Sequence, residues 1–261
     1  MKNWPRYGVP AIVFALALGL WEWRVHALGI SPLVVATPSE IWAAFFEHWD
    51  VLGPALLFTL RVTAFAFVLA TLAGVGLAIL FSQSRLIEYA LYPFAVVLQV
   101  TPVVAIAPLL LIWIGYDNVT EVLVVLAWII AFFTILSNTL TGLRSTDHNL
   151  IDLMKLYGAS RWQVLWRLQL PSALPYILTG MKISGGLALI GAVTAEFVAG
   201  SGTDLGLGWV ITLAGRNLDT AQVFAALALL SILGIAILFA MTALEWALLH
   251  RWHESAVKRE G

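Results

Sequence analysis

The chain contains no cysteine, so its 261 residues hold no disulfide framework, no thiolate metal site and no cysteine nucleophile. Charged residues are also scarce. They make up 11% of the sequence, and the net charge of -1 gives no excess of positive charge for binding nucleic acid. No glycine is followed directly by lysine, which excludes the Gly-x4-Gly-Lys-Ser/Thr loop that cradles nucleotide phosphates. The sequence therefore predicts neither metal nor nucleotide chemistry in this chain.

Apolar residues are abundant instead. They make up 61% of the chain, and the mean hydropathy of +0.92 excludes an ordinary soluble domain. Runs of about 20 apolar residues can cross the hydrocarbon core as helices, which satisfy every backbone polar group internally. We therefore expect an all-α polytopic membrane protein with six transmembrane helices. These spans are expected near Tyr7–Leu28, Ala55–Phe81, Tyr89–Ile114, Val119–Leu140, Ala173–Val198 and Val223–Leu249.

Lysine and arginine are distributed unevenly between the two sets of connecting loops. The positive-inside rule places the richer set in the cytoplasm, so both termini and the loop between the fourth and fifth spans are expected there. The first span lacks a small-residue cleavage site, so we interpret it as an anchor rather than a signal peptide. The poorer set contains only Arg24 and Arg216. The richer set contains Lys2, Arg6, Arg85, Arg144, Lys155, Arg161, Arg167, Arg251, Lys258 and Arg259.

We expect the whole chain, residues 1–261, to form one transmembrane domain. A short cytoplasmic segment (1–6) precedes the first span, and a cytoplasmic tail (250–261) follows the last. Between the first two spans, residues 38–50 carry apolar side chains at helical spacing behind Ser39, a candidate N-cap. A short helix in the outer interface that braces the first span is expected, with contact to an external receptor as the alternative.

A polar interruption at about residues 144–171 separates the fourth and fifth spans and is longer than most connections. Asp147 can cap a short helix, and Gly158 permits a sharp bend because glycine adopts positive φ without steric cost. A second short helix restarts at Ala159-Ser160, and Pro171 either ends it or opens the next span. We expect two short amphipathic helices exposed on the cytoplasmic side. A hairpin that only packs on the bundle is the alternative.

This interruption resembles the cytoplasmic coupling motif of bacterial ABC-importer permeases. The family pattern is Glu-Ala-Ala-x3-Gly-x9-Ile-x-Leu-Pro, and Gly158 and the Leu170-Pro171 pair match it in register. Asp152-Leu153-Met154 replaces the usual opening, which keeps the charge but brings bulkier side chains. Further runs are similar to permeases for nitrate, sulfonates, taurine and pyrimidine precursors. These runs are Thr37-Pro38-Ser39, Thr59-Leu60-Arg61-Val62, Thr101-Pro102, Pro108-Leu109-Leu110, Trp113-Ile114-Gly115 and Ala195-Glu196-Phe197-Val198.

The resemblance implies a type I ABC-importer permease of the bacterial inner membrane that carries a small polar solute. It implies a second permease subunit, as a homodimer, together with two cytoplasmic ATPases, an extracytoplasmic solute-binding protein and surrounding membrane lipid. ATP and Mg²⁺ would be bound by the ATPases, so this chain would bind no cofactor and would not be an enzyme. The residues implied in ATPase docking are Asp152, Leu153, Met154, Gly158, Ala159, Leu168, Leu170 and Pro171.

Three ionisable residues fall within or at the ends of spans, where such residues are functional candidates. Arg61 lies near the outer end of its span, where it can snorkel to the headgroups or make a structural pair. Lys182 is expected to anchor the cytoplasmic end of the fifth span. Glu196, at the outer end of that span, is expected either to pair with Arg61 or to shape an outer gate.

Polar and helix-bending residues mark a candidate translocation path. Thr101-Pro102 lies near the middle of the third span and Pro108 follows it, which favours a bent helix beside the path, with plain bundle curvature as the alternative. Ser184 and Thr194 would line the path if their helix face borders it. The nearby glycines of the fifth span are expected to serve close helix packing.

The sequence also bears on two other classes of protein, an intramembrane enzyme and a stand-alone carrier or channel. An intramembrane serine protease with Ser184 as nucleophile needs a histidine at membrane depth, but all five histidines lie in loops or at span ends. A metalloprotease needs His-Glu-x-x-His, which His253-Glu254 does not continue. A stand-alone secondary carrier or channel remains the alternative to a transporter subunit. Such a carrier would transport in liposomes that contain no ATPase.

Overall fold

The structure, a computed structural model, describes residues 4–199 and 206–250, which are mostly helical and contain no strand. The all-α membrane fold is confirmed: five helices are long and apolar enough to cross a membrane, or six if a bent pair is one span. Residues 1–3 and 251–261, which belong to the predicted terminal segments, lie outside this description. The elements are α1 (Trp4–Ala27), α2 (Pro38–Glu47), α3 (Trp49–Gln83), α4 (Arg85–Val100), α5 (Val103–Ile114), η1 (Tyr116–Asn118), α6 (Val119–Arg144), α7 (His148–Leu156), α8 (Arg161–Val164), η2 (Leu165–Gln169), α9 (Leu170–Ala199), α10 (Leu207–Arg216) and α11 (Thr220–Leu249).

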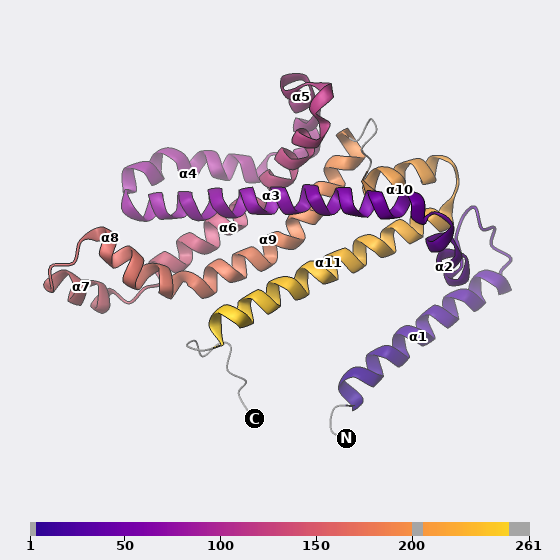
Figure 1. Cartoon of the computed structure of the whole chain (residues 1–261), viewed down its shortest axis with the longest axis horizontal. Helices are drawn as coiled ribbons and strands as arrows, with labels where there is room; N and C mark the ends of the chain where they lie inside the picture. The colour runs from indigo at the N-terminus through magenta and orange to yellow at the C-terminus, as the bar shows by residue number, and fades with distance from the viewer. Residues whose placement is uncertain (1–3, 200–205, 251–261) are drawn as a thin grey trace.

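The centre of the bundle is formed by α3, α6 and α9, and α11 runs beside α9 (Figure 1). Small residues allow α6 and α9 to approach closely. A Cβ on Gly191 would lie 2.8 Å from the Cα of Ala127, and one on Gly180 would lie 2.9 Å from Asn138 of α6. A Cβ on Gly185 would lie 2.9 Å from Ile237 of α11, whereas Gly186 faces open space. The expected packing role therefore holds for three of these four glycines of α9.

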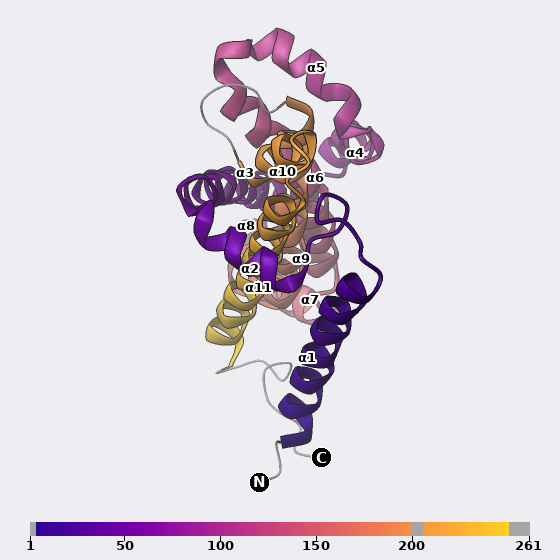
Figure 2. The same cartoon turned by 90° about the vertical axis from the view of Figure 1, so that its right-hand side faces the viewer.

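The third predicted span, Tyr89–Ile114, is not one continuous helix. It consists of α4 and α5, which meet at 105° around Thr101-Pro102. Proline lacks an N–H and disfavours helical geometry in the residue before it, and Thr101 accordingly adopts an extended conformation with ψ of 127°. The break turns α5 out of line with α4 (Figure 2), and Ala107 and Leu111 of α5 are buried against α3, α6 and α9.

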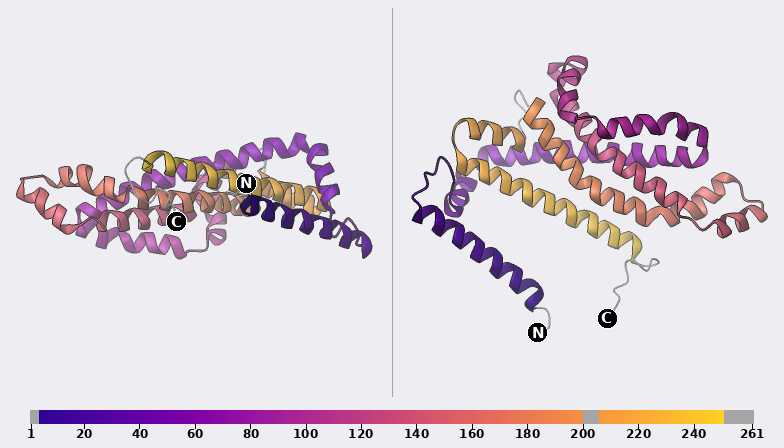
Figure 3. Two further views of the ribbon diagram at one scale, coloured as in Figure 1. Left: turned by 90° about the horizontal axis from the view of Figure 1, so that it is seen from below. Right: turned by 180° about the vertical axis from the view of Figure 1, so that it is seen from behind.

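The two ends of the bundle differ in what they carry. Helices α7 and α8 lie at one end, and α2 and α10 lie at the opposite end, which we call the outer end (Figure 3). The side chains of Arg144, Lys155 and Arg161 belong to the α7–α8 end. Helix α10, which was not among the predicted elements, follows α9 at the outer end.

The predicted helix at residues 38–50 is present as α2, but its cap is Thr37 rather than Ser39. The Thr37 hydroxyl accepts a hydrogen bond from the Glu40 N–H at 3.3 Å, and the Glu40 carboxylate accepts one from the Thr37 N–H at 2.8 Å. Ser39 instead donates its hydroxyl proton to Glu22 of α1 at 2.7 Å. This bond ties α2 to α1, in keeping with the expected brace for the first span.

Candidate functional site

The coupling segment, residues 144–171, begins with α7. Asp147 caps this helix, because its side chain accepts a hydrogen bond from the Asn149 N–H at 2.8 Å. Asp152 and Lys155 form an exposed ion pair at 2.9 Å. Leu153 is exposed and Met154 is half-buried, so the bulkier replacements for the two family alanines do not both point into the bundle.

Gly158 makes the bend that the sequence predicts. Its φ of +78° lies in the left-handed region, and a Cβ there would meet no neighbouring atom. Backbone conformation alone therefore requires glycine at this position. Helix α8 then begins after Ser160, which is its N-cap and forms a capping box with Gln163. On the near side of the bend, Leu156 and Tyr157 are each 85% exposed, so the tip presents apolar side chains away from the bundle.

The second predicted helix of this segment does not stand alone. α8 continues through the π-helical turn η2 into α9 without a break, and together they make one helix from Arg161 to Ala199. Val164 and Leu165 are buried where the segment meets the bundle. Leu168 and Leu170 are half-buried, and Pro171 lies in the first turn of α9. Because this helix is continuous, Pro171 neither ends the second helix nor opens the span, and it lies just after the π-helical turn that joins α8 to α9.

At the outer end, Glu196 joins three helices. It is 1% exposed, and its carboxyl oxygens accept one hydrogen bond from the Thr59 hydroxyl at 2.8 Å and one from the Gly208 N–H at 2.7 Å. Thr59 in turn accepts from the Leu207 N–H at 2.9 Å. We call Thr59, Glu196, Leu207 and Gly208 the outer clasp. The clasp satisfies two N–H groups at the start of α10 and fixes that helix to α3 and α9.

The two glycines at the start of α10 leave room for the Glu196 side chain. A Cβ on Gly206 would collide with the carboxyl group, and one on Gly208 would lie 2.9 Å from its Oε2 atom. Close contact between a buried carboxyl and a glycine backbone at this point makes the position of α10 depend on Glu196.

Comparisons with known proteins identify the family of the chain. The family model for the inner membrane component of binding-protein-dependent transport systems matches residues 70–248. The chain belongs to this family. It is 35% identical to the riboflavin transport system permease protein RibX of Chloroflexus aurantiacus, over 97% of this chain and 92% of the relative. It is 33% identical to the formylaminopyrimidine transport permease protein ThiX of Halalkalibacterium halodurans (92% and 94% covered) and 30% identical to the taurine transport system permease protein TauC of Escherichia coli (92% and 87% covered).

This permease also shares its fold with a solved transporter. An inward-facing structure of the MetNI methionine ABC transporter superposes with a TM-score of 0.68 at 19% identity, covering 77% of this chain and 98% of the other. The protein is thus a permease subunit of a binding-protein-dependent ABC importer with the type I permease fold, as expected from its sequence.

Of the two roles expected for Glu196, a pair with Arg61 is not present in the permease. Glu196 does not bind Arg61, because both carboxyl oxygens of Glu196 face the outer clasp. Arg61 is exposed, and it has no ion-pair partner among the residues that the structure describes. Lys182 forms an ion pair with Glu245 at 3.1 Å, which joins α9 to α11. This position is in keeping with the structural role expected of Lys182.

The candidate path residues are scattered over the permease. Thr101 donates its hydroxyl proton at 2.6 Å to the Val97 carbonyl, which also accepts the Thr101 N–H at 3.0 Å, so the side chain bonds within its own helix rather than facing a cavity. Ser184 is fully buried and donates to the Ala131 carbonyl of α6 at 2.9 Å, so it faces a neighbouring helix rather than a cavity. Thr194 is half-buried and donates to Ile190 in its own helix.

Sequence reasoning missed Thr59 and the start of α10 as partners of Glu196. Thr59 lies in the run Thr59-Leu60-Arg61-Val62, in which only Arg61 is ionisable, so charge alone does not single out Thr59. The signal that could have found α10 is Gly206-Leu207-Gly208, a glycine pair that follows the Glu196 run at a distance of about ten residues.

Proposed function

We propose that two copies of this permease form one translocation path, driven by two cytoplasmic ABC ATPases and supplied by an extracytoplasmic solute-binding protein. The ATPases would bind ATP and Mg²⁺, and this chain would bind no cofactor and catalyse no reaction. In this arrangement residues 1–261 form a single permease domain of the bacterial cytoplasmic membrane, with both termini in the cytoplasm. The unequal distribution of lysine and arginine supports this orientation.

The exposed tip of the coupling segment carries the proposal. Leu156 and Tyr157 project from the bend at Gly158 into open surroundings, and Trp162 is 58% exposed just beyond it. Apolar side chains gathered on a projecting loop beside a family docking motif mark a protein contact. Asp152, Leu153, Met154, Gly158 and Ala159 form the proposed docking surface. Leu168, Leu170 and Pro171 form its connection to the bundle.

Pairing with a second copy is supported by the apolar surface of the outer helices. α1 stands away from the central helices, and Phe14 on α1 and Phe239 on α11 are 66% and 69% exposed (Figure 2). Lipid and a second permease are the two surroundings that cover such faces in a membrane. A closed two-fold pair is the commonest way for identical chains to assemble.

The proposed solute is a small polar molecule of the heterocyclic or sulfonate kind. Relatives of 30 to 35% identity carry names for riboflavin, formylaminopyrimidine, aliphatic sulfonate and taurine transport, and more distant ones for nitrate. Along the path we propose Thr101, Pro102 and Thr194 as lining residues, and Glu196 as a gate residue that acts by holding α10. The burial of Ser184 against α6 favours packing for that residue.

The test is the pair of substitutions Gly158→Arg and Gly29→Arg, assayed by co-purification of the ATPase and by solute uptake. Both glycines have positive φ (+78° and +60°) and open space around the missing Cβ, so both variants carry a similar backbone strain of about 1–2 kcal/mol. Only Gly158 lies in the coupling segment. We expect Gly158→Arg to insert normally but lose the ATPase and uptake, while Gly29→Arg keeps both. Retention of the ATPase by Gly158→Arg would refute the docking role.

A further inference from the structure

A small cavity lies where the coupling segment meets the end of α3. Its volume is about 190 Å³, below the range of about 300–1,000 Å³ that encloses a drug-sized ligand, so it suits a single small group. Its polar lining comes from four elements that are distant in sequence: Ser82 and Gln83 of α3, Lys155 of α7, Arg161 of α8 and Gln169 of η2. The cavity is therefore a junction between the coupling segment and the bundle.

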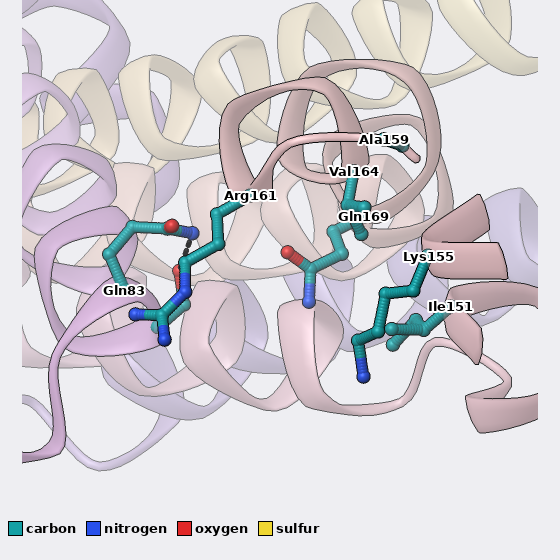
Figure 4. A pocket seen from close by; sticks show the side chains of 8 residues that line it. Gln83, Ile151, Lys155, Ala159, Arg161, Val164 and Gln169 are labelled. Carbon is teal, nitrogen blue, oxygen red and sulfur yellow. Dashed lines mark hydrogen bonds between the residues drawn. The ribbon is translucent and has the colours of Figure 1, made fainter. Parts of the chain in front are cut away.

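The side chains of this cavity offer N–H donors. Figure 4 shows the guanidinium of Arg161 beside the Gln83 amide, with the Gln169 amide and the Lys155 ammonium pointing to the same side. Among the described residues, Arg161 has no carboxylate partner, and no carboxylate lines the cavity. Lys155 reaches it from an exposed pair with Asp152. Two cationic groups and an amide facing one space complement an oxyanion.

A second cavity of about 560 Å³ shares Ser82, Ile151 and Gln169 with the first and extends it toward the start of α4. It adds Arg85, Arg144 and His148, with Glu88 as its one carboxylate, and Glu88 is paired with Arg144. Beside these charges, Leu86 and Tyr89 in the first turn of α4 are 78% and 71% exposed. Basic donors thus adjoin an apolar surface.

We propose that the two cavities together bind the headgroup of an anionic phospholipid, with its phosphate between Lys155, Arg161 and Gln169 and its acyl chains along Leu86 and Tyr89. A soluble oxyanion would bind the N–H donors but would not contact the apolar surface, whereas a lipid would do both. The lipid is therefore favoured. The inference rests on the proposed cytoplasmic placement of the coupling segment, because basic groups at the inner leaflet meet anionic lipid. Bound lipid would tie α7 and α8 to the end of α3, so it would set how firmly the coupling segment is held.

The test titrates the purified full-length permease in neutral detergent with dioleoylphosphatidylglycerol or dioleoylphosphatidylcholine and follows the thermal unfolding midpoint. We expect only the anionic lipid to raise the midpoint. In the double variant Lys155→Gln/Arg161→Gln, the lipid concentration for half the effect should rise about 25-fold, about fivefold for each lost charge. The matched control is Arg24→Gln/Arg216→Gln, which removes two positive charges from the outer end and should keep the wild-type response.

Two outcomes would overturn the inference. One is an equal response to the anionic lipid in the Lys155/Arg161 double variant and the wild type; if the double variant also loses ATPase co-purification, both side chains belong to the docking surface instead. The other is a midpoint shift by inorganic phosphate at the concentration at which the lipid acts, which would assign the donors to a soluble oxyanion. The lipid titration contains no ATPase, so its failure is distinct from a failure of the docking test on Gly158.

Discussion

Glu196→Ala is the sharpest test of how the outer end of this permease is held. The substitution leaves the Thr59 hydroxyl and the Gly208 N–H, both buried, without their acceptor. A buried donor without a partner costs about 1–3 kcal/mol, so the two together cost about 2–6 kcal/mol, before the effect of the emptied volume. Since α3, α6 and α9 also pack through many other buried side chains, whereas α10 is held at its start by Glu196, we expect the loss to appear mainly as local opening of α10.

The assay is hydrogen–deuterium exchange over residues 206–216, compared with a peptide from α6 in the same sample. We expect Glu196→Ala to raise exchange in α10 and leave α6 unchanged, with uptake lost while the amount of protein in the membrane stays near normal. Glu196→Gln keeps one acceptor oxygen and should give an intermediate result. Unchanged exchange in α10, or an equal rise in α6, would refute the reasoning.

A double substitution checks the contact itself. Gly206 has a φ of -85°, which alanine adopts freely, so Gly206→Ala is harmful only because its Cβ collides with the Glu196 carboxyl. In the Glu196→Ala background that group is absent, and Gly206→Ala should be better tolerated, with an interaction energy of about 0.5–3 kcal/mol. Strictly additive effects would show that the two residues do not touch.

Two further predictions concern the contacts between helices. Lys182→Met leaves Glu245 unpaired between α9 and α11, so the free energy of unfolding should fall by about 1–3 kcal/mol, seen as a lower thermal unfolding midpoint. The double variant Lys182→Met/Glu245→Met should recover most of this loss. A double variant no more stable than the single one would contradict the prediction. Thr37→Ala removes the capping box of α2 and should lower the free energy of unfolding by about 0.5–2 kcal/mol, measured in the same way. Thr37→Ser keeps the hydroxyl and should lose less. An equal loss in both variants would count against the cap.

The sequence predicted those features that depend on local composition. Span lengths follow from apolar runs, and the bend at Gly158 follows from the one residue type that adopts positive φ freely. The break at Thr101-Pro102 was harder to predict, because Pro54, Pro93 and Pro175 all lie inside helices that continue past them. Hydropathy depends on the polarity of the side chains and not on the direction of the helix axis, so it could not show that α5 bends away from the axis of α4.

The partner of Glu196 depended on three-dimensional position. Arg61 and Thr59 lie at nearly the same depth on α3, but residues two apart point to opposite sides of a helix. Thr59 is buried toward α9, and Arg61 is exposed. Charge complementarity favoured Arg61 as one alternative, but the observed bond is to Thr59 and joins residues 137 positions apart. Only the packing of α3 on α9 determines which of the two side chains reaches Glu196.

The coupling segment and the outer clasp occupy opposite ends of one helix. The 39 residues from Arg161 to Ala199 are continuous, which at 1.5 Å per residue is about 58 Å. A movement imposed on α8 by an ATPase would therefore reach Glu196 without crossing a loop, and Glu196 would pass it to α10. Substitutions at the two ends of this helix should therefore have different effects on ATPase binding and uptake. Gly158→Arg should lose both the ATPase and uptake, whereas Glu196→Ala should keep the ATPase bound and lose uptake alone. Loss of the ATPase by both variants would show that the clasp supports the whole fold rather than the outer end.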